Sequence, residues 1–151
     1  MNIITYDQTP DRAHWLAELR RADWEAGALL CRLLDEGTLA KELGDGAEVL
    51  LLTDGDRLVS YCTLAPYDDV WDNLQETPWI GFVYTFPAYR GQRCAGQLLA
   101  HCEQLAAQSG RKFVYISTPH IGLYEKYGYA FHRRAADYLG NPCRVYRREV
   151  S

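Results

Sequence analysis

The residues whose types and spacing could do chemistry lie mainly in one segment, where an apolar strand-like run leads into a helix-like run. The run from Val83 to Phe86 ends at Pro87, and an Arg90-Gly91 pair precedes several small residues. The amides of a helix's first turn lack partners inside the helix and lie at the positive end of its dipole. Small side chains let an anion approach these amides, and arginines add positive charge. We therefore predict a diphosphate-binding cradle made of Arg90, Gly91, Gln92, Arg93, Cys94, Ala95 and Gly96.

Two other kinds of phosphate-binding loop do not fit the sequence. Gly91 and Gly96 have the spacing of a nucleoside-triphosphate loop, but Gln97-Leu98 follows where that loop needs Lys and Ser or Thr. This missing lysine disfavours a nucleotide-binding switch protein. Gly44 and Gly46 precede a predicted strand and lack the third glycine of a dinucleotide-binding turn. An ordinary strand–helix junction with surface arginines stays open as an alternative to the cradle.

Two motifs in this order resemble those of the GNAT N-acyltransferases. Val83 through Leu99 resembles the acyl-coenzyme-A-binding motif of that family, and Leu123 through Tyr129 resembles its later helix-to-strand motif. Arg93 stands where the family usually has glycine, so this cation could weaken the packing of the loop or add a phosphate contact. With the order of strands and helices, the resemblance covers nearly the whole chain. It implies a mixed α+β fold, with a mostly antiparallel sheet of five to seven strands flanked by helices.

The resemblance also implies a reaction and the residues that would perform it. Acetyl-CoA would be the acyl donor, its pantetheine arm would bind the backbones of Val83 and Thr85 with Tyr84 between them, and a primary amine would attack the thioester directly. The backbone amide of Val83 would polarise the thioester carbonyl. Tyr124 matches the family's tyrosine that protonates the departing thiolate, which would otherwise reverse the reaction.

The group that takes the proton from the amine is not identified by the sequence. Family members often use a glutamate on the strand assigned here to residues 79–86, but Trp79-Ile80-Gly81-Phe82 contains no acid. One alternative is that a nearby loop acid takes the proton through a bridging water molecule. The other is that each of these acids is a solvated loop carboxylate with no part in the reaction. The family often has Asn and Ala where this chain has Ser117 and His120, and an imidazole side chain is a common general base in enzymes. The candidates are therefore Glu76, Asp72, Asp69, Asp68, His120 or water.

These residues depend on a set of strands and helices that the hydrophobic pattern predicts. A β-hairpin over residues 48–65 turns at Asp54-Gly55-Asp56, and an apolar stripe of Ala95, Leu98, Leu99, Cys102, Leu105 and Ala106 marks the main helix. The predicted strands are residues 2–6, 48–53, 58–65, 79–86, 113–117, 129–132 and 143–149. The first predicted helix is capped by Asp11 and runs through Leu19. The second carries apolar residues from Ala28 to Leu39 and ends at Gly44-Asp45-Gly46. The third covers residues 92–108, and a short fourth one runs from Thr118-Pro119 to Gly128.

Composition sets the remaining limits. The 151 residues, 48% of them hydrophobic, suit a single domain over residues 1–151. The chain has no apolar run long enough to span a membrane and no export signal at its start, and its five cysteines are expected to be reduced. We therefore expect a cytoplasmic protein. No zinc-like cluster or Gly-x-Ser-x-Gly elbow occurs, and the net charge of −4 argues against a nucleic-acid partner.

Charge is divided unevenly along the chain. Residues 1–75 hold 15 acidic and 6 basic side chains, whereas residues 76–151 hold 5 acidic and 10 basic ones. This division fits a cation-attracting surface next to an anion-binding one, and two differently solvated faces without a ligand are the alternative on charge alone. The resemblance to the GNAT N-acyltransferases implies a metal-independent N-acetyltransferase acting on a small-molecule or protein amine, with its oligomeric state left open. The alternative is a regulatory module that binds acyl-CoA without turnover, because the strand acid is missing and Ser117 replaces the family's Asn.

Overall fold

A computed structural model describes residues 1–70 and 75–151 of the chain. Its strands are β1 (Asn2–Thr5), β2 (Glu48–Asp54), β3 (Arg57–Ala65), β4 (Trp79–Thr85), β5 (Phe113–Thr118), β6 (Ala130–Ala136) and β7 (Pro142–Glu149). Its α-helices are α1 (Arg12–Leu19), α2 (Glu25–Glu36), α3 (Leu39–Leu43) and α4 (Cys94–Gln108). Among the helices in these ranges, none has both the length and the apolar character needed to cross a membrane.

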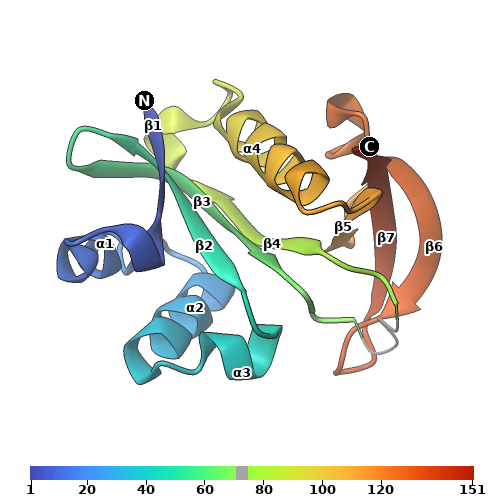
Figure 1. The fold of residues 1–151 in the computed structure, drawn as a ribbon, viewed down its shortest axis with the longest axis horizontal. Helices are drawn as coiled ribbons and strands as arrows, with labels where there is room; N and C mark the ends of the chain where they lie inside the picture. Colours follow the sequence, from blue (N-terminus) through green and yellow to red (C-terminus); the bar gives the residue numbers. More distant parts are fainter. Residues whose placement is uncertain (71–74) are drawn as a thin grey trace.

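The seven strands form one sheet in the order β1-β2-β3-β4-β5-β7-β6 (Figure 1). Every neighbouring pair is antiparallel except β4 and β5, which run parallel. A parallel pair needs a crossover connection, and α4 supplies it. The predicted mixed, mostly antiparallel sheet flanked by helices is confirmed.

Two cores lie on opposite faces of this sheet. In β2, Val49 and Leu51 pack toward α1, α2 and α3, whereas Leu50 and Leu52 pack toward α4. This alternation follows from the two-residue period of a strand, and all four side chains are buried because both faces are covered. Figure 1 shows α4 lying across one face and the three N-terminal helices on the other. A ligand reaching both layers must therefore pass through the sheet or around its edge.

Three predicted helices differ from the observed ones. The helix predicted from Ala28 to Gly44 is divided into α2 and α3, because Gly37 takes a left-handed conformation (φ 70°) that ends α2. The main helix begins at Cys94, two residues later than predicted. The short helix predicted from Thr118 is reduced to one 3₁₀ turn, Glu125–Tyr127, because the Thr118 hydroxyl accepts the His120 amide (3.1 Å) and closes a local turn.

The C-terminal strands also differ from their predicted bounds. β6 extends to Ala136 rather than ending at residue 132, and β7 begins at Pro142. The turn between them is built by Asp137, whose carboxylate accepts the amides of Leu139 (2.9 Å) and Asn141 (2.8 Å). Such aspartate turns are local, but how far the flanking strands run depends on the pairing of β6 with β7.

Candidate active site

The central feature of the site is that strands β4 and β5 separate from one another partway along their length. The two strands are in register only at Trp79–Tyr115 and Ile80–Ile116, although β4 continues to Thr85 and β5 to Thr118. The backbone edges beyond Ile80 therefore face one another without strand pairing. The two strands therefore separate after Ile80 and Ile116, and Ser117 follows Ile116 on β5.

A β-bulge shapes the β4 side of this opening. Phe82 and Val83 stand opposite the single residue Cys62 of β3, and Phe82 has a left-handed backbone (φ 50°). Bulges bend a strand and re-aim its groups, and they are common beside active sites. Here the bulge turns Val83 toward the α4 side, while Tyr84 is buried on the opposite face, where it stacks on Trp24.

The loop that follows β4 delivers the predicted cradle residues to the start of α4. Gly91 (φ 80°) and Arg93 (φ 58°) both adopt left-handed conformations, and Gln97 donates the first bond of the helix, to the Arg93 carbonyl (3.3 Å). The first turn contains no acidic residue and no side-chain cap. The amides of residues 94–96 thus begin α4 without intrahelical partners, as an anion site requires.

The structure gives three cradle residues roles that sequence reasoning did not foresee. Gly96 is required by Tyr127, because an added Cβ would lie 2.8 Å from the ring atom Cε1. The Arg93 guanidinium lies over the same ring, 5.4 Å from its centroid. Arg90 donates to the Thr85 carbonyl (2.9 Å) and lies over Tyr84, so it fastens the end of β4. The lack of a side chain at Gly96 is therefore explained by packing between the segment of residues 83–99 and the segment of residues 123–129.

Tyr124 lies immediately before the 3₁₀ turn and is buried in the core beneath α4. Its ring meets that of Tyr129 edge to face, with centroids 6.2 Å apart. Burial raises the pKa of Tyr124 to about 12, and the charges that Cys62 and Asp68 would carry act in the same direction. Because its pKa is raised, the phenol is protonated at neutral pH. No hydrogen bond from another described residue engages its hydroxyl, so the hydroxyl can donate to a ligand.

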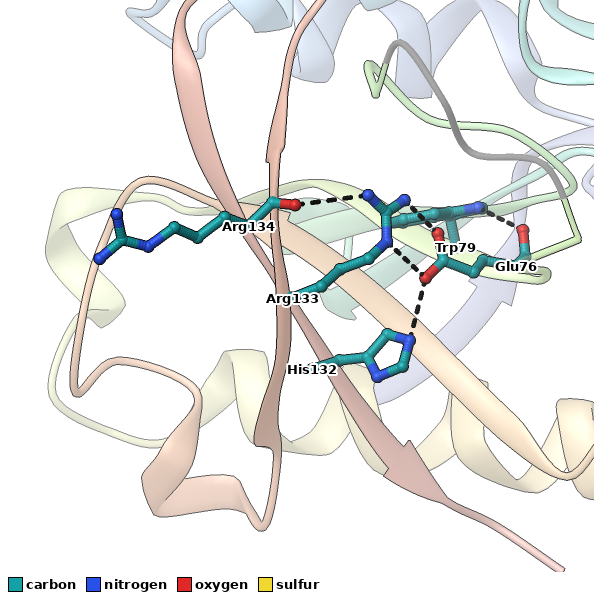
Figure 2. Close-up of polar contacts among 5 residues, drawn as sticks. All are labelled: Glu76, Trp79, His132, Arg133 and Arg134. Atoms are coloured by element: carbon teal, nitrogen blue, oxygen red, sulfur yellow. Dashed lines mark hydrogen bonds and ion pairs between the residues drawn. The ribbon is translucent and has the colours of Figure 1, made fainter.

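Glu76 is not a solvated loop carboxylate. Arg133 Nε donates to Glu76 Oε2 (2.9 Å), another nitrogen of the same guanidinium donates to Oε1, and His132 Nε2 lies 3.2 Å from Oε2. Figure 2 shows Arg133 and His132 converging from β6 on this carboxylate. Trp79 also donates its indole N–H to the Glu76 carbonyl (2.6 Å). Glu76 therefore joins the β3–β4 loop to β6 and is occupied by two partners.

The other candidate bases occupy different surroundings. Asp69 accepts the Tyr138 amide (3.2 Å), and His120 is exposed in the turn after β5. Asp72 lies outside the described residues. The Asp68 carboxylate packs on β4, with Oδ1 2.8 Å from the place where a Cβ of residue 81 would stand.

Burial raises the pKa of Asp68 to about 7, and the charge of Asp69 adds to this shift, while a hydrogen bond from the Asp69 backbone opposes it. Sequence reasoning gave Asp68 no more weight than its neighbours. The signal that could have found it is Gly81, a glycine within a buried strand, which indicates close approach by another group.

The model of the Acetyltransferase (GNAT) family matches residues 8–129. No curated protein matches the chain by sequence.

Solved structures share the fold over the full length of the chain. A protein from Desulfovibrio desulfuricans, described as an acetyltransferase of the GNAT family, has a TM-score of 0.73 at 15% identity, covering 99% of each chain. The aminoglycoside 6'-N-acetyltransferase from Enterococcus faecium has a TM-score of 0.70 at 16% identity, covering 100% of this chain and 98% of that one. A GNAT family acetyltransferase from Elizabethkingia anophelis, solved with acetyl-CoA bound, has a TM-score of 0.65 at 18% identity, covering 98% and 97%. These likenesses establish the fold, and the family model, which spans most of the sequence, establishes that the chain belongs to the Acetyltransferase (GNAT) family.

Proposed function

We propose that this protein transfers an acetyl group from acetyl-CoA to a primary amine. The observation that carries the proposal is the separation of β4 from β5 after Ile80, with the start of α4 free of acidic residues and side-chain caps and with Tyr124 in the core beneath α4. Such an opening lets an extended thioester lie along β4 while its phosphates reach the helix. Family membership supports acyl transfer in general, and the residues below carry the specific mechanism.

The cofactor's diphosphate would bind at residues 90–96. The amides of Cys94, Ala95 and Gly96 supply donors at the positive end of the α4 dipole, and Arg93 adds a full positive charge beside them. Gly91 and Gln92 complete the loop. Cys94 is a backbone donor only, because its side chain is buried and burial raises the pKa of its thiol.

The pantetheine arm would bind along Val83, Tyr84 and Thr85, the residues of β4 that β5 does not pair. The bulge at Phe82–Val83 supports a role for the Val83 amide in polarising the thioester carbonyl, since it breaks the regular pairing with β3 at that point. A fixed N–H aimed at a developing oxyanion stabilises the tetrahedral intermediate without reorganisation.

Tyr124 would protonate the leaving thiolate. Its raised pKa keeps the phenol protonated through the neutral and mildly alkaline range, and its hydroxyl is available to the sulfur. An acid placed in this way contributes about 10²- to 10⁴-fold to the rate of a proton-coupled step. The neutral amine attacks the carbonyl directly, so no covalent acyl-enzyme and no metal is required.

The acceptor is proposed to be an amine that is cationic at neutral pH, because the acidic side chain of Asp68 lies against β4 where this strand leaves β5. The relative from Enterococcus faecium is an aminoglycoside acetyltransferase, so such amines belong in the test panel. The competing function is a regulatory module that binds acyl-CoA without turnover, favoured by the lack of an acid within β4 and by Ser117.

One experiment separates these functions. Calorimetry with coenzyme A and acetyl-CoA measures binding, and thiol release from acetyl-CoA is followed with spermidine, an aminoglycoside, free lysine and a lysine-containing peptide. Binding with amine-dependent thiol release supports the transferase. Binding without release from any amine favours the regulatory module, and no binding of either thiol compound overturns both.

A further inference from the structure

The β3–β4 loop carries one carboxylate directly onto β4 at the point where β4 leaves β5. From this geometry we infer that Asp68 takes the proton from the acceptor amine, in place of an acid on the strand itself. The inference rests on the proposed acetyl transfer and names the residue that the sequence could not.

Gly81 and Asp68 act as one structural unit. Ile80 faces the core beneath α4, so the next residue, Gly81, faces the opposite side of the sheet. An added Cβ there would lie 2.8 Å from Asp68 Oδ1 and 3.3 Å from the Thr63 hydroxyl oxygen. The carboxylate thus occupies the volume that a side chain at position 81 would fill. Because Ile80–Ile116 is the last register pair, this volume adjoins the opening.

The loop around Asp68 is held in place on both sides. The Tyr67 amide donates to the Leu43 carbonyl (3.0 Å), and the Val70 amide donates to the Asp68 carbonyl (2.8 Å). Val70 is fully buried against Trp79 in a small core on this face of the sheet. The backbone on either side of Asp68 is therefore anchored to the fold, as a group that must meet a reacting amine requires.

The surroundings of Asp68 suit proton transfer near neutral pH. No ion pair in the described ranges involves this carboxyl, unlike Glu76, which Arg133 and His132 hold. The charge of Asp69, in the same loop, acts on Asp68, and the charge of Asp68 acts on Tyr124 together with those of Cys62 on β3 and Tyr127. Burial is the main cause of its raised pKa, and a base with a pKa near 7 is well matched to catalysis at neutral pH.

The proton balance of the reaction is complete with these two residues. The Asp68 carboxylate removes one proton from the ammonium group and later releases it to solvent. The amine nitrogen then forms a bond to the thioester carbon, and the carbon–sulfur bond breaks. Tyr124 gives its proton to the sulfur and recovers one from the nitrogen of the intermediate. An ammonium ion and acetyl-CoA thus yield the amide, coenzyme A and one proton.

The first test is the pH profile of kcat/KM for Asp68→Asn, measured with acetyl-CoA and the amine of the panel that reacts fastest. We expect the wild-type rate to rise with pH through a midpoint of about 7, the pKa of Asp68. The variant should lose about 10²- to 10⁴-fold at pH 7 and lack this inflection, while recovering part of the loss at higher pH as free amine accumulates.

Asp69→Asn is the matched control. It makes the same chemical change one residue away, and its amide oxygen can still accept the Tyr138 amide. Because the charge of Asp69 raises the pKa of Asp68, we expect this variant to stay active with its midpoint shifted to lower pH. A role for Asp68 in folding alone would not move the midpoint in this way.

Two further measurements keep the inference testable if Asp68→Asn folds poorly. Gly81→Ala should lower kcat and shift the midpoint, since its methyl group would displace the Asp68 carboxylate. Carbon-13 titration of the wild-type aspartates should reveal one carboxyl with a midpoint near 7.

The outcomes distinguish this inference from the proposed function. Unchanged pH profiles in both Asp68→Asn and Gly81→Ala, or no aspartate titrating well above pH 4, overturn the role of Asp68 and leave the transferase intact. A wild-type chain that acetylates no amine overturns the proposed function, and this inference with it.

Discussion

Arg93 and Tyr127 come from the two separate motifs of the chain and meet with the guanidinium carbon 5.4 Å from the ring centroid. Gly96 packs against the same ring, so the start of α4 is fitted to the 3₁₀ turn that carries Tyr127. Tyr124 directly precedes that turn. The proposed phosphate site and the proposed acid are therefore linked through a single aromatic side chain, and a change in one motif is expected to affect the other.

Arg93→Glu should weaken the binding of coenzyme A at least about tenfold, because it removes a charge-assisted contact and sets a negative charge beside the helix start. Arg111→Glu is the matched control, since it makes the same charge change at an exposed residue beyond the other end of α4. Isothermal titration calorimetry measures both affinities. Equal affinities for the two variants would remove Arg93 from the cradle.

Tyr124→Phe should lower kcat by about 10²- to 10⁴-fold while leaving the affinity for coenzyme A nearly unchanged. Because burial raises the pKa of Tyr124 to about 12, the wild-type rate should show no loss from ionisation of this acid below about pH 11.

Tyr129→Phe is the comparison for this variant, since it removes a hydroxyl that donates to Glu103 (2.8 Å). It should cost about 1 kcal/mol of folding free energy and spare the chemical step. Equal kcat values for Tyr124→Phe and the wild type, measured by stopped-flow thiol release, would refute the assignment of the acid.

Glu76→Gln should destabilise the fold by about 1–3 kcal/mol, because hydrogen bonds to charged groups are worth about that much and the contacts that Arg133 and His132 make with Glu76 would lose the negative charge of its carboxylate. Since Glu76 is not the proposed base, the inflection of kcat/KM near pH 7 should persist. Glu149→Gln, an exposed change near the end of β7, should leave the unfolding midpoint nearly unaltered. Chemical denaturation of the three proteins checks the prediction, and equal midpoints would contradict it.

Stability should depend on pH through Asp68. A carboxyl whose pKa is raised on folding binds more protons in the native state than in the unfolded state, so the free energy of unfolding falls as pH rises between the two pKa values. For Asp68 this window runs from about 3.8 to about 7.

Asp68→Asn removes that dependence, so its stability relative to the wild type should be greater at pH 8 than at pH 5. Denaturant unfolding at the two pH values measures the difference. A wild-type and variant pair whose relative stability is the same at both would show that the carboxyl is not desolvated.

The sequence by itself determined the strand–helix junction at residues 83–99. Its signals are local: an apolar run, a proline, a glycine at a left-handed position and a helical stripe that begins beside small residues. Local patterns also predicted the β2–β3 hairpin and most strands, since period-two alternation follows from burial on one or both faces. The short helix expected after Thr118 failed for a local reason that periodicity does not record, namely a threonine hydroxyl that competes for a backbone amide.

Only the tertiary structure decided which loop acid meets β4. Asp68 lies over Gly81 and Glu76 pairs with Arg133, and both contacts join residues whose spacing in the chain carries no periodic signal. Neighbouring carboxylates in one loop look alike in sequence, yet burial against a glycine raises the pKa of Asp68 while an arginine from β6 holds Glu76 in an ion pair. The physical reason is that desolvation and ion pairing depend on surroundings assembled from distant strands, which exist only once the sheet has formed.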